Sequence, residues 1–136
     1  MAATLTKLRE ALYTKLSGDA ALTTLLGGAN IFYRPRKAVI SVPSVTYFDF
    51  GTKPDPLVPL MDRTIQLDIW ERSTEKAEEI AFRIRQLLDL KNLVLPGLEA
   101  RPVYLHWQAD RDIPEEEGDI AHKTVEYRLL AYELVA

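Results

Sequence analysis

The side chains best suited to chemistry lie in one short stretch, residues 110–119, where six of ten residues are acidic and one is basic. The acidic residues are Asp110, Asp112, Glu115, Glu116, Glu117 and Asp119. Carboxylates are preferred ligands of Ca²⁺ and Mg²⁺, but an EF-hand loop needs oxygen ligands at alternate positions and glycine at the sixth. Here the fifth residue is Pro114 and the sixth is Glu115. The segment Asp110–Asp119 therefore predicts a solvated acidic loop and no metal site, because acidic runs are usually exposed to water.

Two histidines, His106 and His122, offer the next candidate chemistry. Neither stands in the H-E-x-x-H motif, in which two histidines one helical turn apart bind zinc. His106 alternates with Val103, Leu105 and Trp107, so a strand there would turn it away from the apolar face. We interpret both histidines as structural or incidental residues.

Nucleophilic and phosphate-binding motifs are missing from the sequence. It has no cysteine and no G-x-S-x-G motif, and the pair Gly27-Gly28 lacks the Lys-Ser/Thr that completes a phosphate-binding loop. Carboxylates are numerous, but none stands in the apolar sequence context typical of a catalytic acid. The sequence therefore predicts a protein that is not an enzyme and needs no cofactor.

Charge is unevenly distributed along the chain. The formal net charge is −3, whereas residues 110–119 alone carry −5, so the remaining residues sum to +2. Binding of nucleic acid through bulk positive charge is therefore not expected, because phosphate neutralisation supplies most non-specific affinity. Residues 32–37 (Phe-Tyr-Arg-Pro-Arg-Lys) are of a kind that stacks on single strands, but a strand end followed by a solvated loop is the simpler interpretation.

Length and composition set the class of protein. A chain of 136 residues with 47% hydrophobic content is expected to form one domain, residues 1–136. No apolar run approaches the roughly 20 residues of a membrane-spanning helix, and the N-terminus lacks the basic segment and apolar core of a signal peptide. We therefore expect cytoplasmic synthesis and no membrane partner.

Two helices are predicted before the first strand. Leucines at spacings of three and four predict a helix over Leu5–Leu16, with Thr4 as N-cap and Ser17-Gly18 at its end. A second helix, Ala20–Leu26, follows with Asp19 as N-cap and Gly27-Gly28 at its end.

Strands are predicted next, at Ile31–Arg34, Ser44–Phe50 and Thr64–Trp70, with a proline-rich connection over Gly51–Pro59. In Thr64–Trp70 apolar and polar residues alternate, as is typical of a strand with one buried face. A helix capped by Ser73 or Thr74 then runs to Leu88. Its apolar residues form one stripe of Ala77, Ile80, Ala81, Ile84, Leu87 and Leu88. Burying this stripe gains less free energy than ordering the helix costs, so the helix must lie on a sheet.

After a turn at Pro96-Gly97, the alternating strands Val103–Gln108 and Lys123–Val135 predict an antiparallel hairpin around the acidic loop. Together these elements predict an α+β fold. Its sheet is antiparallel or mixed, with about four to five strands and two main helices on one face.

The order of these elements, with several local patterns, resembles the phage tail-completion or tail-terminator family, which includes the λ tail terminator and siphophage tail-to-head joining proteins. The patterns are Leu5-x-x-Leu8-x-x-x-Leu12, Asp19-x-x-Leu22-x-x-Leu25-Leu26-Gly27, Asn30-Ile31-Phe32, Ser41-x-Pro43-x-Val45-x-Tyr47, Gln66-Leu67-Asp68-Ile69-Trp70 followed at once by a capped helix, Asp110-Arg111-Asp112, and a closing strand with Tyr127 and Tyr132-Glu133.

The resemblance implies a structural protein of the virion tail, made in the cytoplasm of the bacterial host. It implies a ring of about six subunits that caps the tail tube and joins it to the head. The implied partners are other copies of the chain, the major tail protein and a head-completion or connector protein, with no cofactor and no sequence-specific nucleic acid. The alternative function is a small non-enzymatic ligand- or peptide-binding module encoded in a cellular operon.

Candidate interface residues follow from these expectations. Trp70 lies on the strand face opposite Ile65, Leu67 and Ile69, and tryptophan is enriched at interface hot spots. The alternative is that a second layer of the same chain buries it. The acidic residues Asp110, Asp112, Glu115, Glu116 and Glu117 are the other candidates, because a ring would bring their charges close to those of neighbouring copies.

Overall fold

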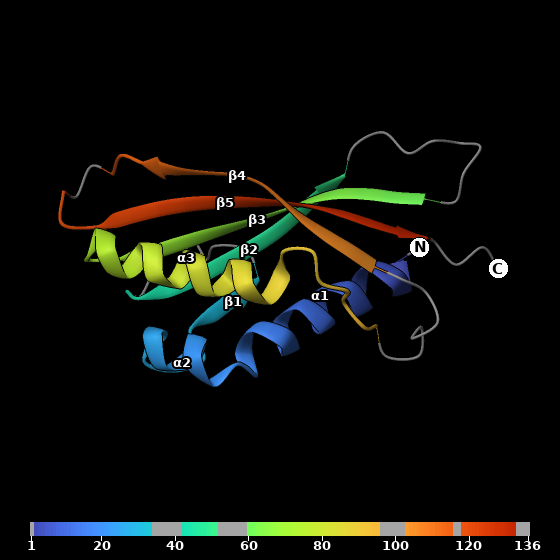
Figure 1. The fold of residues 1–136 in the computed structure, drawn as a ribbon, viewed down its shortest axis with the longest axis horizontal. Helices are drawn as coiled ribbons and strands as arrows, with labels where there is room; N and C mark the ends of the chain where they lie inside the picture. Colours follow the sequence, from blue (N-terminus) through green and yellow to red (C-terminus); the bar gives the residue numbers. More distant parts are fainter. Residues whose placement is uncertain (1, 34–41, 52–59, 96–102, 116–117, 133–136) are drawn as a thin grey trace.

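The computed structural model describes residues 2–33, 42–51, 60–95, 103–115 and 118–132. These residues form three helices and one five-stranded sheet (Figure 1). The elements are α1 (Ala2–Ser17), α2 (Ala20–Leu26), β1 (Ile31–Tyr33), β2 (Ser44–Gly51), β3 (Leu60–Glu71), α3 (Thr74–Leu88), β4 (Val103–Ile113) and β5 (Ala121–Tyr132). The predicted α+β class is confirmed.

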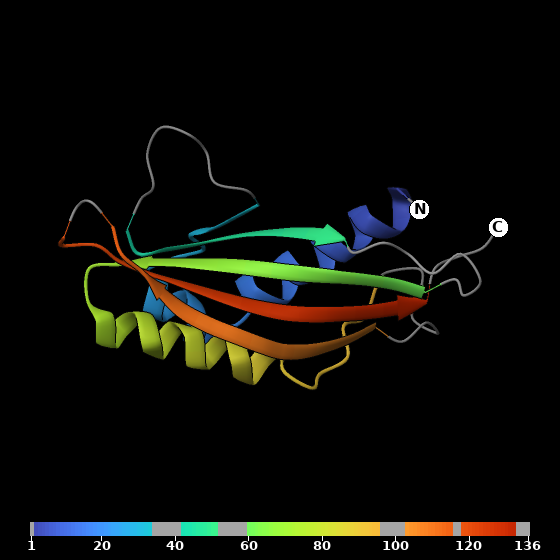
Figure 2. The ribbon, with the colours of Figure 1, turned by 90° about the horizontal axis from the view of Figure 1, so that it is seen from above.

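The sheet is mixed, with strand order β1-β2-β3-β5-β4. β1 pairs with β2 in parallel, and the other three pairings are antiparallel. All three helices lie on one face of the sheet (Figure 1), and Figure 2 looks onto the other face. No helix in the described part of the chain is both long and apolar enough to cross a membrane.

Most of the predicted helix boundaries are confirmed by cap geometry. Asp19 accepts a hydrogen bond from the amide of Leu22, and Gly27 ends α2 with a φ of 71°, a conformation that glycine adopts without strain. Ser73 caps α3 by accepting a bond from the amide of Lys76. The expected N-cap of the first helix was wrong: α1 begins at Ala2, so Thr4 lies within its first turn.

The helix stripes and the inner faces of the strands form one core. The stripe of α3 is buried at Ala77, Ile80, Ala81, Ile84 and Leu88, and α1 contributes Leu8, Leu12 and Leu16. The sheet contributes Val45, Tyr47, Ile65, Leu67, Ile69, Val103, Leu105, Val125, Tyr127 and Leu129. α3 therefore lies on the sheet, as predicted from the free energy needed to order this helix.

One carboxylate interrupts the inner face of the sheet. Asp49 of β2 receives bidentate bonds from Arg9 of α1 at 2.8 and 3.2 Å, and further bonds from Arg63 of β3. Burial would raise the pKa of Asp49, but the two guanidinium groups outweigh burial and hold this pKa below its usual value of 3.8. The triad thus ties α1 to two strands of the sheet.

Three strands extend beyond one of their predicted bounds. β3 begins at Leu60, β5 begins at Ala121, and β4 continues past Gln108 to Ile113. The prediction of an acidic loop starting at Asp110 was therefore wrong: Asp110 and Asp112 are strand residues, and the connection begins after Ile113. Several predicted features lie outside the described residues. They are the turn at Pro96-Gly97, the end of the first strand at residue 34, the proline-rich connection at 52–59 and the end of the last strand at 133–135.

Candidate functional site: the interaction surface at the β4–β5 hairpin

The most organised polar cluster surrounds His122 at the start of β5, on the sheet face that carries no described helix. Its Nε2 lies 2.8 Å from Oδ1 of Asp68 on β3, and its Nδ1 lies 2.5 Å from Oε1 of Glu115 in the connection after β4. Its ring stacks on Trp70, with centroids 3.7 Å apart and planes at 17°. These four residues are called the His122 cluster below. The cluster fastens the hairpin connection to the middle of the sheet.

Asp68 is the anchor of this cluster. It is only 6% exposed, although it faces away from the helices. Besides His122, the hydroxyl of Thr124 donates to its Oδ1 at 2.8 Å and the amide of Gln66 donates at 3.2 Å. Burial alone would raise the pKa of Asp68, but these hydrogen bonds outweigh it, so the pKa lies below 3.8.

The contacts of His122 favour the imidazolium form. A neutral imidazole has one N–H donor, whereas both nitrogens here face carboxylates, and only the cation can donate to both. Burial opposes the charge, but the hydrogen bonds to Asp68 and Glu115 outweigh it and raise the pKa of His122 above 6.5. The cluster is therefore a charged bridge between the hairpin connection and β3.

We expect Glu115→Gln to lower the pKa of His122, because it removes one of the two carboxylates that stabilise the imidazolium. NMR titration of the two histidines measures this, and the ring resonances of His122 are assigned with a His106→Gln variant. The matched control is Glu126→Gln on the same sheet face, where the carboxylate bonds to Arg111 and not to His122. An unchanged His122 titration in Glu115→Gln would contradict the Glu115 contact.

Within the described part of the chain, Trp70 is partly buried by neighbours in its own sheet, and no described helix covers this face as a second layer. Its ring stacks on His122, and its Nε1–H donates to the hydroxyl of Thr46 at 3.2 Å. The stacking fixes the orientation of the ring, so its remaining surface is presented in one conformation.

A β-bulge reorients the acidic end of β4. The register shifts between Trp107 and Ala109, so that Asp110 pairs with Val125 and Asp112 with Lys123. Without the shift, Asp110 and Asp112 would share the outward face of Tyr104 and His106. With it, they turn toward the helix side of the sheet, and Asp112 accepts a bond from Lys123 at 3.2 Å.

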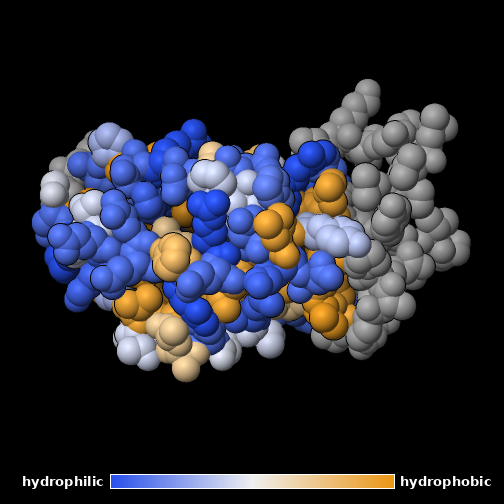
Figure 3. Space-filling view, in the orientation of Figure 1, coloured by the Kyte–Doolittle hydropathy of each residue, from blue (hydrophilic) through white to orange (hydrophobic). Residues whose placement is uncertain are grey.

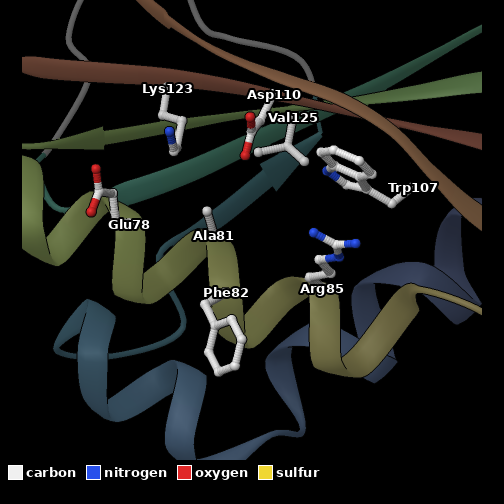
Figure 4. Close-up of a pocket in the computed structure, with 8 residues that line it drawn as sticks. All are labelled: Glu78, Ala81, Phe82, Arg85, Trp107, Asp110, Lys123 and Val125. Atoms are coloured by element: carbon white, nitrogen blue, oxygen red, sulfur yellow. The ribbon is translucent and has the colours of Figure 1, made fainter.

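The bulge places Asp110 at a groove between α3 and β4 (Figure 4). The groove has a volume of about 240 Å³ and is lined by Glu78, Ala81, Phe82, Arg85, Trp107, Asp110, Lys123 and Val125. Arg85 lies over the ring of Trp107, 4.2 Å from its centroid, and pairs with Asp89 at 3.5 Å. The lining of the groove therefore combines aromatic surface with charges of both signs.

The remaining candidates occupy separate places. His106 is exposed on the outward face of β4, as predicted, with its Nδ1 3.6 Å from Asp89. Glu116 and Glu117 lie outside the described residues. Among the described residues, no three acidic or histidine side chains are grouped closely enough to hold a metal ion.

Sequence reasoning missed the His122 cluster. One signal was present: Asp68 is a charged residue in the middle of a strand whose other face is apolar, and such a charge needs a partner when it is buried. The partner is 54 positions away in the chain. Only the pairing of β3 with β5 identifies it as His122.

The fold and this hairpin together define a small α+β protein with an organised cluster of charged side chains at one end of the sheet. The chain belongs to the family described as tail completion protein gp17, whose model matches residues 10–132. It is therefore a structural protein of phage tails, and the resemblance noted in the sequence is confirmed.

A solved structure supports the fold assignment. One chain of a structure described as "Virion of native gene transfer agent (GTA) particle" matches with a TM-score of 0.76 and 16% identity, over 93% of this chain and 95% of that chain. At this identity the likeness shows a shared fold. No curated protein matches the chain.

Proposed function

We propose that this chain forms a ring that caps the polymerised tail tube and joins it to the head. Membership of the tail completion family over residues 10–132 is the observation that carries the proposal. The likeness of this fold to a chain in a virion-like particle supports the proposal, because the match covers 93% of this chain and 95% of that chain. The proposed partners are further copies of the chain, the major tail protein and a head-completion protein.

The role we propose is structural and not enzymatic, and it is carried out in the virion tail after synthesis in the host cytoplasm. A ring needs a surface that meets a different surface of the next copy, which is a heterologous contact. Trp70, Asp110, Asp112, Glu115, Glu116 and Glu117 are the residues we propose for contacts with neighbouring molecules. Among the described residues, hydrophilic side chains cover most of the surface seen in Figure 3, which suits polar and charge-paired contacts.

Deletion of the gene from the phage or particle that encodes it tests this function. We expect lysates in which filled heads and tails are separate and tails have irregular lengths, because no ring stops tube growth or provides the head-side surface. Electron microscopy of the lysate measures both features, and adding the purified protein should restore joined particles. Normal joined virions in the deletion lysate would refute the proposal.

A further inference from the structure

The second half of β4 is an open strand edge. β4 is the last strand of the sheet, and each of its residues 108–112 is exposed. The first half is covered, because the amides of Leu90 and Leu93 donate to its carbonyls. Within the described parts of the chain, residues 108–112 have no backbone partner on this outer side. An edge of this kind is able to pair with a further strand.

The backbone groups offered at this edge belong to Asp110 and Asp112. Side chains and peptide groups both alternate along a strand, so residues that share a face also turn their peptide groups to the same side. Val103 and Leu105 are buried on the helix side, and their carbonyls point to the outer edge. Past the bulge, Asp110 pairs with the buried Val125 and therefore shares that face, as does Asp112. Their peptide groups thus point outward, and a strand added here directs every second side chain toward α3.

The groove beside this edge has unmatched negative charge. Both cations of its lining are already paired with carboxylates, Arg85 with Asp89 and Lys123 with Asp112. Two further carboxylates line the groove, Glu78 from α3 and Asp110 from β4 (Figure 4). Within the described residues neither of them forms an ion pair. Cationic side chains entering the groove would therefore meet carboxylates that have no other partner.

The same groove also offers apolar surface. Ala81, Phe82, Trp107 and Val125 contribute to its lining, and Phe82 is 63% exposed. Lysine and arginine side chains bury their aliphatic stems on such surface while the charged end stays in contact with polar groups. The combination of apolar lining and unmatched carboxylates therefore suits long basic side chains better than short polar ones.

We infer that the second half of β4 docks an extended basic segment of another protein. The segment pairs with the edge at Asp110 and Asp112, and its alternate lysine or arginine side chains enter the groove toward Asp110 and Glu78. The same edge of a second copy is a poor occupant, because Asp110 and Asp112 of the two copies would lie on one face of the joined sheet, and facing like charges are destabilising. The inference goes beyond the proposed ring and does not depend on it.

Peptide binding tests the class of partner. The probe is a short fluorescent peptide in which lysine and threonine alternate, because an extended chain directs such lysines to one face. We expect saturable binding by fluorescence anisotropy, and no binding of the same peptide with glutamate in place of lysine. A third peptide keeps the lysines but is methylated on every backbone nitrogen, so it cannot donate to the edge and should bind roughly tenfold more weakly. No binding of the lysine peptide, or equal affinity of its methylated form, overturns the inference.

Charge reversal tests which residues meet the lysines. Asp110→Lys and Glu78→Lys should each weaken binding of the lysine peptide by roughly tenfold, because a like charge replaces a carboxylate. The matched controls are Asp119→Lys and Glu79→Lys, which change the net charge equally. Asp119 is exposed and paired with Arg72, and Glu79 follows Glu78 on α3, but neither lines the groove. Equal affinities in all four variants overturn the inference.

Hydrogen exchange followed by NMR tests the strand pairing. With the lysine peptide bound, the amides of Asp110 and Asp112 should exchange more slowly, because they donate to the added strand. The amide of Arg111 faces β5 by the same alternation, so its exchange should hardly change. Unchanged exchange of the two aspartate amides overturns the inference. So does slow exchange before the peptide is added, which would show that a second copy already occupies the edge. Gene deletion tests the capping function independently of these results.

Discussion

Ile84→Asp is expected to abolish the folded state. Ile84 is fully buried in the middle of the α3 stripe, where the helix lies on the sheet. The substitution removes a packed aliphatic side chain, at about 2–5 kcal/mol for truncations of this kind. It also buries a carboxylate with no partner, which costs several kcal/mol more. A domain of this size has roughly 5–15 kcal/mol of stability in total, so the folded population is lost.

The same helix supplies the control. Phe82 is two residues away and 63% exposed. Phe82→Asp introduces the same carboxylate on the solvent side of α3, where a substitution usually changes stability by about 0.5 kcal/mol or less. Circular dichroism melting of both variants distinguishes the two sites. A cooperative melt near the wild-type temperature for Ile84→Asp would contradict the placement of this helix face.

The elements that the sequence predicted well are those with local causes. The α3 stripe has a spacing that only a helix brings onto one face, and Ser73 is a side chain that caps a helix within three residues of itself. Asp19 and Gly27 mark the ends of α2 in the same way. In each case the residues that cause the structure are neighbours in the chain.

The acidic end of β4 was not predictable for the opposite reason. Simple alternation from Val103 and Leu105 assigns Asp110 to the outward face. The bulge after Trp107 reverses that assignment, and no glycine or proline marks it in the sequence. The bulge is a property of how β4 pairs with β5. The groove that contains Asp110 therefore became visible only with the strand pairing.

Buried charges were missed because their partners are distant in the chain. Asp49 is paired with Arg9, 40 positions before it, and Asp68 with His122, 54 positions after it. The sequence shows that these charged residues are present but does not show which of them are in contact. The strands β2, β3 and β5 place the partners together, and this long-range pairing turns ordinary surface residue types into buried structural ones.

Asp68→Asn is expected to destabilise the protein by roughly 2–4 kcal/mol near pH 6, because it removes the charge that holds His122 and Thr124 in a buried site. The matched control is Asp119→Asn. Asp119 also forms an ion pair, with Arg72, but both side chains are more than two thirds exposed. Exposed pairs contribute about 0–1 kcal/mol, so this control should change stability little. Urea unfolding measures both variants, and equal small effects would contradict the anchoring role of Asp68.

The pH dependence of the stability difference between wild type and Asp68→Asn tests the contact between Asp68 and His122 directly. The pKa of His122 is raised in the folded state, so its contribution is complete below the unfolded value of about 6.5 and is lost as the pH rises through the folded pKa. The pKa of Asp68 is lowered, so its contribution is present above about pH 4 and is lost as the pH falls through its folded pKa. The ion pair between Asp68 and His122 therefore stabilises the fold most between about pH 4 and pH 6.5.

The stability difference between wild type and Asp68→Asn should accordingly be largest from about pH 4.5 to 6.5 and should narrow as the pH rises further. The physical cause is that a neutral His122 loses less when the carboxylate beside it is replaced by an amide. Urea unfolding at unit steps from about pH 5 to pH 9 measures the narrowing. Asp119→Asn, in which His122 keeps both of its carboxylates, should show a nearly constant difference over the same steps. If the difference in stability between wild type and Asp68→Asn were also constant, Asp68 would not stabilise the charged form of His122. The hydrogen bond from Thr124 would then account for the effect of the substitution.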